Sequence, residues 1–113
     1  MKKIEFIKMH GLGNDFVIID RRYNGIEITK EIINKLSNRK TGAGCDQLIT
    51  IEKGLSDKYD ARIQIYNSNG DTAEACGNGT RCVAKLLFDE KNLSNIKLQS
   101  LAGILIAEKT DNN

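Results

Sequence analysis

Short apolar runs at strand spacing, separated by turns rich in glycine and asparagine, are the dominant pattern of the sequence. Proline is absent and ten glycines punctuate the chain, so its turns depend on glycine and asparagine chemistry. Most runs alternate with a period of two, as half-buried strands do, whereas the apolar run at residues 16–20 predicts a strand buried on both faces. The runs that predict strands are 4–9, 16–20, 47–51, 62–67, 96–101 and 104–109.

Two other stretches carry the longer apolar spacing of an amphipathic helix. The first is predicted as a surface helix over residues 30–38, with Thr29 as its N-cap. The second covers residues 80–90 and is predicted to begin just after Cys76. The apolar stripes consist of Ile32, Ile33 and Leu36 in the first stretch and of Cys82, Val83, Leu86 and Leu87 in the second.

The turns between these elements predict how they connect. The Asn-Gly pair at residues 69–70 predicts a hairpin, and the Ala-Gly pair at residues 102–103 predicts another. Residues 10–15 are predicted as a glycine-rich turn and the polar residues 53–60 as a loop. Because no linker, repeat or low-complexity tract divides residues 1–113, we expect one α/β or α+β domain.

Composition excludes several classes of function. The formal charge is +2, with acidic and basic residues interspersed, so no basic face for nucleic acid is expected. No segment approaches the roughly 20 apolar residues of a membrane span, and no apolar signal region follows the N-terminus. Three cysteines cannot all pair and are unlike a disulfide framework. We therefore expect a cytoplasmic protein with no membrane or nucleic-acid partner.

Cys76 is the strongest candidate for chemistry. It lies between a predicted strand and a predicted helix, beside glycines that allow a ligand to approach the backbone. The free N–H groups at the helix start, Asn78, Gly79 and Thr80, favour a nearby anion, either the Cys76 thiolate or a substrate carboxylate. A thiol at such a position ionises more readily than a free one. The alternative is a tight turn with a small buried residue.

The other cysteines and the single histidine are interpreted as structural. Cys82 falls on an apolar helix stripe, Cys45 lies in a loop without a base nearby, and His10 is expected to hydrogen-bond to backbone. A zinc site from His10, Cys45, Cys76 and Cys82 is disfavoured because the paired short spacing of zinc ligands is missing. A dinucleotide-binding fingerprint is excluded, since Phe16 stands where the third glycine is required.

Side-chain amides are the candidate groups for substrate binding. Asn14, Asn67 and Asn78 each lie at a predicted strand end or helix start. Side chains at such positions can converge on the opening of one binding site. An amide donates to a carboxylate and accepts from an ammonium group without adding charge, which suits a zwitterion. Taken singly, each of them is better explained as a turn or cap residue than as a ligand.

Three segments in the order of the chain closely resemble diaminopimelate epimerases: residues 8–16, 44–48 and 67–82. The resemblance implies inversion of the α-carbon of LL-diaminopimelate to the meso form, without cofactor or metal, for lysine and peptidoglycan precursor synthesis. It implies that Cys76 is one of two acid/base thiols. The positions that match the family's substrate contacts are Asn14, Gln47, Asn67, Gly77 and Asn78.

The resemblance also implies an architecture. The family looks like two pseudo-symmetric halves, each a curled, mostly antiparallel sheet around a central helix, with the site between the halves and commonly a homodimer. Residues 1–113 correspond to the N-terminal half, so the second thiol belongs to a C-terminal half. We expect this chain alone to be inactive or barely active, with an exposed sheet edge that favours self-association.

Two alternatives stay open beside this interpretation. A phenazine-biosynthesis-type isomerase resembles the same fold, but its base is acidic, and Cys76 argues against it. A free-standing half-domain could instead serve as a binding or assembly module through its exposed sheet edge.

Overall fold

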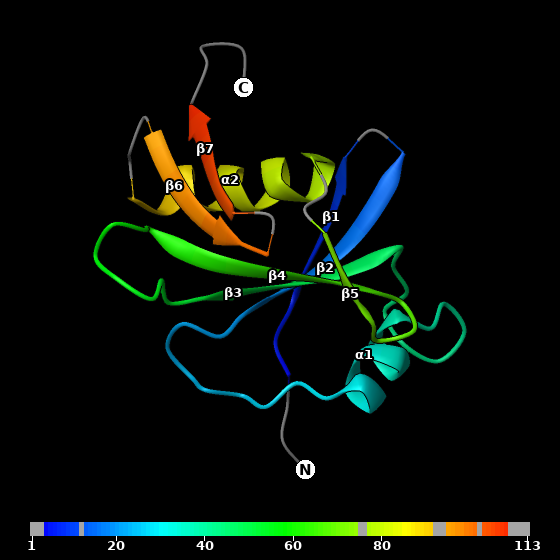
Figure 1. Ribbon diagram of the computed structural model, residues 1–113. Helices are drawn as coiled ribbons and strands as arrows, with labels where there is room; N and C mark the ends of the chain where they lie inside the picture. Colours follow the sequence, from blue (N-terminus) through cyan, green and yellow to red (C-terminus); the bar gives the residue numbers. More distant parts are fainter. Residues whose placement is uncertain (1–3, 12, 75–76, 92–94, 102, 109–113) are drawn as a thin grey trace.

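A computed structural model describes residues 4–11, 13–74, 77–91, 95–101 and 103–108 of the chain. Within them, seven strands form one sheet, accompanied by two helices (Figure 1). The elements are β1 (Ile7–Gly11), β2 (Asn14–Asp20), α1 (Lys30–Ser37), β3 (Gln47–Glu52), β4 (Ala61–Asn67), β5 (Thr72–Ala73), α2 (Gly77–Lys91), β6 (Asn95–Ser100) and β7 (Gly103–Glu108). Neither helix is long and apolar enough to cross a membrane within this described part.

The sheet is mostly antiparallel, as expected. Its strand order is β1-β2-β3-β4-β6-β7, and the short β5 pairs with β4. Only β2 with β3 and β4 with β6 run parallel among the described pairs. The sheet curls around α2, which lies against one face, while α1 lies on the other side (Figure 1). The expected curled sheet around a central helix is confirmed.

Two apolar cores lie on the two faces of the sheet. In β2, Phe16 and Ile18 belong to the cluster that packs under α2, whereas Val17 and Ile19 belong to the cluster around α1. None of these four side chains is more than 1% exposed. The continuous apolar run therefore forms a strand buried on both faces, as predicted, because each face is covered by a helix.

Helix α2 begins close to the sheet because of a glycine. The helix starts at Gly77, three residues before the predicted apolar stretch. At Gly79, an added Cβ would lie 2.7 Å from Ile49 Cδ1 and 3.3 Å from Phe16 Cε1. A side chain at Gly79 would thus push the first turn of the helix away from β2 and β3. Further along, Val83 and Leu87 are fully buried in the core.

The predicted turn over residues 10–15 is shorter than expected. His10 pairs with Asp15 and Gly11 pairs with Asn14, so both strands extend into the expected turn. Gly13, which directly precedes β2, adopts a φ of +91°, a conformation that glycine tolerates.

The other predicted elements agree with the structure within a few residues. The amide of Ile32 donates to Thr29 Oγ1 at 3.2 Å, which confirms the predicted N-cap. Helix α1 ends at Ser37, one residue before the predicted end. Both predicted hairpins are present as antiparallel strand pairs, β4 with β5 and β6 with β7, although Ala102 of the second turn lies outside the described residues.

The open sheet leaves two outer strands, β1 and β7. Each pairs with one other strand of the described residues. On β7, Ile104 and Ile106 are 58% and 64% exposed. The expected exposed edge is thus present, with apolar side chains beside it.

Candidate active site

The candidate amides lie at one end of the apolar core, on the α2 face of the sheet. Asn14 opens β2 and Gln47 opens β3, each two residues before a core side chain that faces α2, Phe16 and Ile49. Asn67 closes β4 and pairs in register with Gln47. Because side chains alternate along a strand, all three amides continue the α2-facing row beyond the core.

Hydrogen bonds join these amides in two pairs. Asn78 Nδ2 donates to Asn14 Oδ1 at 3.1 Å, and Gln47 Nε2 donates to Asn67 Oδ1 at 3.3 Å. The close packing of Gly79 on β2 and β3 brings the start of α2 to the same place. The first pair therefore lies at the start of α2, and the second lies where β3 begins and β4 ends, on the same face of the sheet.

The N-terminal end of α2 is electrostatically suited to an anion. Its first turn contains no acidic residue, so no carboxylate on the turn itself competes for the free N–H groups. Arg81 is exposed, and its Nη1 donates to Asn78 Oδ1 at 3.5 Å. Gly77 opens the helix with no described atom within 4 Å of an added Cβ, so a ligand can reach its backbone.

Cys76, the predicted catalytic thiol, lies outside the described residues. In the sequence it directly precedes Gly77, the first residue of α2. Its role as an acid/base group stays a prediction.

The other two cysteines are structural, as interpreted from the sequence. Cys82 is 6% exposed in the core under α2, whereas Cys45 is 3% exposed in the core around α1, where its thiol donates to Ser37 Oγ at 3.4 Å. They lie on opposite faces of the sheet, so they cannot share one metal ion. No group of three or more His, Cys, Asp or Glu side chains suited to a metal occurs within the described residues.

His10 differs from its interpretation. It is exposed on β1, and its imidazole makes no hydrogen bond to another side chain or backbone group of the described residues. The expected hydrogen bond to backbone is therefore wrong. The reason is that β1 continues past His10, so the residue lies on an edge strand and not inside a turn.

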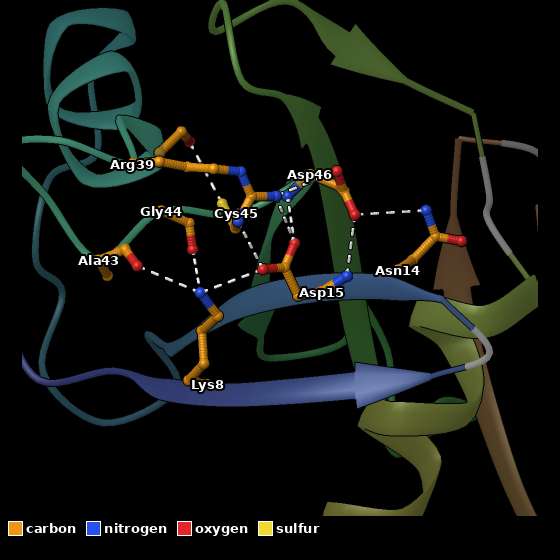
Figure 2. A network of polar contacts seen from close by, with 9 residues as sticks. Lys8, Asn14, Asp15, Arg39, Ala43, Gly44, Cys45 and Asp46 are labelled. Carbon is orange, nitrogen blue, oxygen red and sulfur yellow. Dashed lines mark hydrogen bonds and ion pairs between the residues drawn. The ribbon is translucent and has the colours of Figure 1, made fainter.

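A charged cluster next to Asn14 was not foreseen from the sequence (Figure 2). It consists of Lys8, Asp15, Arg39 and Asp46. Both terminal nitrogens of the Arg39 guanidinium donate to the Asp15 carboxylate, at 2.8 and 2.9 Å, and Nη2 also donates to Asp46 Oδ1 at 3.2 Å. In the sequence, the only sign of this cluster is that Asp15 and Asp46 each stand next to a candidate amide. Arg39 lies in the segment after α1, which carries no motif.

The cluster favours the charged forms of Asp15 and Arg39. The hydrogen bonds from Arg39 hold the pKa of Asp15 well below its usual range, and Lys8 acts in the same direction, although burial opposes both. The Asp15 carboxylate in turn raises the pKa of Arg39. Asp15 therefore stays ionised throughout the neutral and mildly acidic range.

Comparison with known proteins identifies the family. Residues 6–113 match the sequence profile of the family described as Diaminopimelate epimerase. The chain belongs to the diaminopimelate epimerase family. A diaminopimelate epimerase from Rhizorhabdus wittichii is 46% identical over 110 residues, which are 96% of this chain and 38% of that protein. One from Psychrobacter is 45% identical over 112 residues, or 96% of this chain and 38% of that protein.

A third family member, from Nitrosospira multiformis, is 40% identical over 108 residues, or 94% of this chain and 39% of that protein. The chain thus spans about two-fifths of the length of these curated relatives.

Solved structures at low identity share the fold. A probable proline racemase from Agrobacterium radiobacter superposes with a TM-score of 0.73 at 15% identity, covering 98% of this chain and 39% of that one. A methylitaconate-delta-isomerase gives 0.73 at 13% identity, covering 97% and 35%. A phenazine biosynthesis protein from Bacillus anthracis gives 0.71 at 20% identity, covering 99% and 38%. The fold of this chain is therefore shared with proteins described as a racemase, an isomerase and a phenazine biosynthesis protein.

Proposed function

We propose that this chain is the N-terminal half of a diaminopimelate epimerase, which interconverts LL- and meso-diaminopimelate for lysine and peptidoglycan precursor synthesis. The observation that carries the proposal is the pair of Asn14 and Asn78 at the start of α2, with Gln47 and Asn67 paired on the same face of the sheet, in a chain of this family. Neutral amides beside a helix N-terminus match the α-carboxylate and α-ammonium groups of an amino acid.

In this proposal, Cys76 is one of two acid/base thiols. The thiolate of one cysteine takes the α-proton from one face of the substrate, and the thiol of the other gives a proton to the opposite face. The substrate keeps its composition, and the two cysteines exchange protonation states. Because the free N–H groups of α2 face the carboxylate, they stabilise the negative charge that develops during proton removal, so the step needs no cofactor.

Substrate binding is assigned to Asn14, Gln47, Asn67, Gly77 and Asn78. The amides would donate to the carboxylate and accept from the ammonium group, and the backbone of Gly77 would receive the carboxylate. The hydrogen bonds between the amides hold them in place, so little ordering is required when the substrate binds.

The second thiol is assigned to a C-terminal half, since the chain spans about two-fifths of its curated relatives. A groove of about 490 Å³ lies beside α2, between β1 and β7, and is lined by Met9, Cys82, Phe88 and Ile106 among others. Thr80 Oγ1, which also lines it, is buried without a hydrogen-bond partner in the described residues. We assign this groove and the outer strands to contact with the rest of the protein, and expect a homodimer in the cytoplasm, where thiols stay reduced.

The phenazine-biosynthesis type is not favoured. Its representative is 20% identical and shares the fold, whereas diaminopimelate epimerases are 36–46% identical over most of the chain. A free-standing binding module is the second candidate, because β1 and β7 expose free edges.

The test is exchange of the α-proton of LL-diaminopimelate in deuterated water, followed by NMR. The chain is assayed alone and with the C-terminal half of a family member. We expect exchange only when both halves are present, and its loss in Cys76→Ala and Cys76→Ser. Cys45→Ala, a buried thiol on the other face of the sheet, is the matched control and should retain exchange.

Two results would contradict the proposal. Exchange that survives in Cys76→Ser would exclude the thiol mechanism. If the chain binds the C-terminal half but the complex exchanges no α-proton, the result would favour the binding module.

A further inference from the structure

The starts of β2 and β3 are tied together by their aspartates. The parallel ladder begins at the pair Phe16 and Gln47. Before it, Asp46 N donates to Asp15 Oδ1 at 2.8 Å, and Asp15 N donates to Asp46 Oδ2 at 3.0 Å. Each carboxylate thus accepts from the backbone of the other residue. Together with the 3.1 Å bond from Asp46 N to the Asp15 carbonyl, these two bonds hold the strand ends that carry Asn14 and Gln47.

Two carboxylates in this position repel each other unless a cation lies between them. The guanidinium of Arg39 supplies it, with a two-pronged contact to Asp15 and a single contact to Asp46 (Figure 2). Planar guanidinium groups suit such paired acceptors better than ammonium groups do. Lys8 adds a second cation, at 3.2 Å from Asp15 Oδ2.

The loop that follows α1 is shaped around Arg39. At Gly44, where φ is +76°, an added Cβ would lie 2.9 Å from Arg39 Cγ and 3.0 Å from its Cα. Lys8 also donates to the carbonyls of Ala43 and Gly44. The loop is therefore held against Arg39 on one side and against β1 on the other, which fixes the direction from which β3 starts.

The cluster reaches the candidate site through Asn14. Asp46 Oδ2, which accepts from the backbone of Asp15, lies 3.5 Å from Asn14 Nδ2. The oxygen of the same Asn14 amide accepts from Asn78. The amide is thus oriented with its nitrogen toward Asp46 and its oxygen toward the start of α2.

We propose that Arg39 is a positioning residue, which holds Asn14 and Gln47 at the distance and orientation that substrate binding requires by bridging Asp15 and Asp46. The inference rests on the proposed function for the identity of the ligand. Arg39 is not assigned a contact with the substrate, because its guanidinium is occupied by the two aspartates.

The first experiment measures KM and kcat for LL-diaminopimelate in the completed two-half protein carrying Arg39→Ala. We expect KM to rise about tenfold or more while kcat changes less, because misplaced binding groups weaken substrate affinity. Arg39→Lys keeps the positive charge but lacks the paired N–H donors of a guanidinium, so its KM should lie between those of Arg39→Ala and the unchanged protein.

Lys35→Ala is the matched control, since it also removes a cation from an ion pair near the end of α1, that with Glu31 at 3.4 Å. It should leave KM unchanged. An Arg39→Ala variant with KM within twofold of the Lys35→Ala value would overturn the inference.

The second experiment needs no activity, so it separates this inference from the proposed function. Side-chain amide signals of the isotope-labelled chain are compared by NMR between the unchanged chain and Arg39→Ala. We expect the signals of Asn14 and Gln47 to move, and those of Asn24, an exposed amide in a separate loop, to stay in place. Unmoved Asn14 and Gln47 signals would refute the positioning role whether or not the protein is an epimerase.

Discussion

The side-chain amide of Asn78 donates a 3.1 Å hydrogen bond to the side-chain oxygen of Asn14, which lies 64 residues earlier in the chain. This bond ties the first turn of α2 to the first residue of β2. Groups held in place before binding lose less freedom when a substrate arrives. The two residues are therefore expected to act as one unit in substrate recognition.

Replacing Asn78 by Ala should weaken substrate binding in the completed enzyme. The change removes one amide and leaves Asn14 Oδ1 without its donor, and a lost hydrogen bond to a charged ligand corresponds to about tenfold or more in affinity. KM for LL-diaminopimelate is the measurement, with Asn24→Ala as a control at an exposed amide elsewhere. Because the two amides act together, Asn14→Ala added to Asn78→Ala should cost less than the sum of the single changes. Strict additivity would contradict the coupling.

Alanine at Gly77 and at Gly79 should have opposite consequences. At Gly79 the new Cβ meets Ile49 and Phe16, both fully buried, so we expect a loss of stability despite alanine's higher helix propensity of about 1 kcal/mol. At Gly77 no described atom is within 4 Å, so stability should be kept while substrate affinity falls. The free energy of unfolding in urea and the KM for LL-diaminopimelate, each measured for both variants, test this prediction. Equal stability of the two variants would show that the close packing of Gly79 is unimportant.

Truncating Leu87 should strongly destabilise the protein. Its side chain is fully buried under the sheet, and leucine-to-alanine changes at such positions cost about 2–5 kcal/mol. Leu55→Ala, at a side chain that is 72% exposed, should cost much less. Denaturant unfolding gives both free energies. A small effect at Leu87 would mean that α2 is not the centre of the core.

The dependence of stability on pH should report on Asp15. Arg39 lowers the pKa of Asp15 in the folded protein, so the unfolded chain takes up this proton at higher pH than the folded one. The stabilisation is present above the unfolded pKa of about 3.9 and is lost as pH falls through the folded pKa. The free energy of unfolding should therefore decline more steeply below about pH 5 in the unchanged protein than in Asp15→Asn.

The control for that comparison is Asp57→Asn, at an exposed loop position. Its profile should run parallel to that of the unchanged protein. Asp20 and Asp71, whose pKa values are also lowered by Arg22 and Lys30, keep some acid sensitivity in every variant. Parallel profiles for Asp15→Asn and the unchanged protein would contradict the prediction.

Local sequence was sufficient for most elements of the fold. The N-cap at Thr29, the strand at residues 16–20 and the hairpin turns were predictable because capping, burial on both faces and glycine turns each depend on neighbouring residues. The boundary between β1 and β2 was not, since cross-strand pairing extended both strands into the expected turn.

The candidate site was only partly predictable. The residue types of Asn14, Gln47 and Asn67 and their places at strand ends pointed to the site, and the family resemblance selected them. Their pairing could not be read from the sequence, since Gln47 meets Asn67 through the register of β3 with β4. The ion pairs of Arg39 were missed because charged residues in loops have no periodic pattern and find their partners only in the folded chain.

By itself, the sequence determined the alternation of strands and helices, the buried faces and the family, because these follow from the order of apolar residues and from motifs around Asn14 and Cys76. Only the tertiary structure decided which amides face one another and which aspartates share Arg39. The physical reason is distance along the chain. Contacts between residues tens of positions apart depend on the order of the strands, on their register and on the packing of α2 against Phe16 and Ile49. All three are determined by the packing of the whole domain.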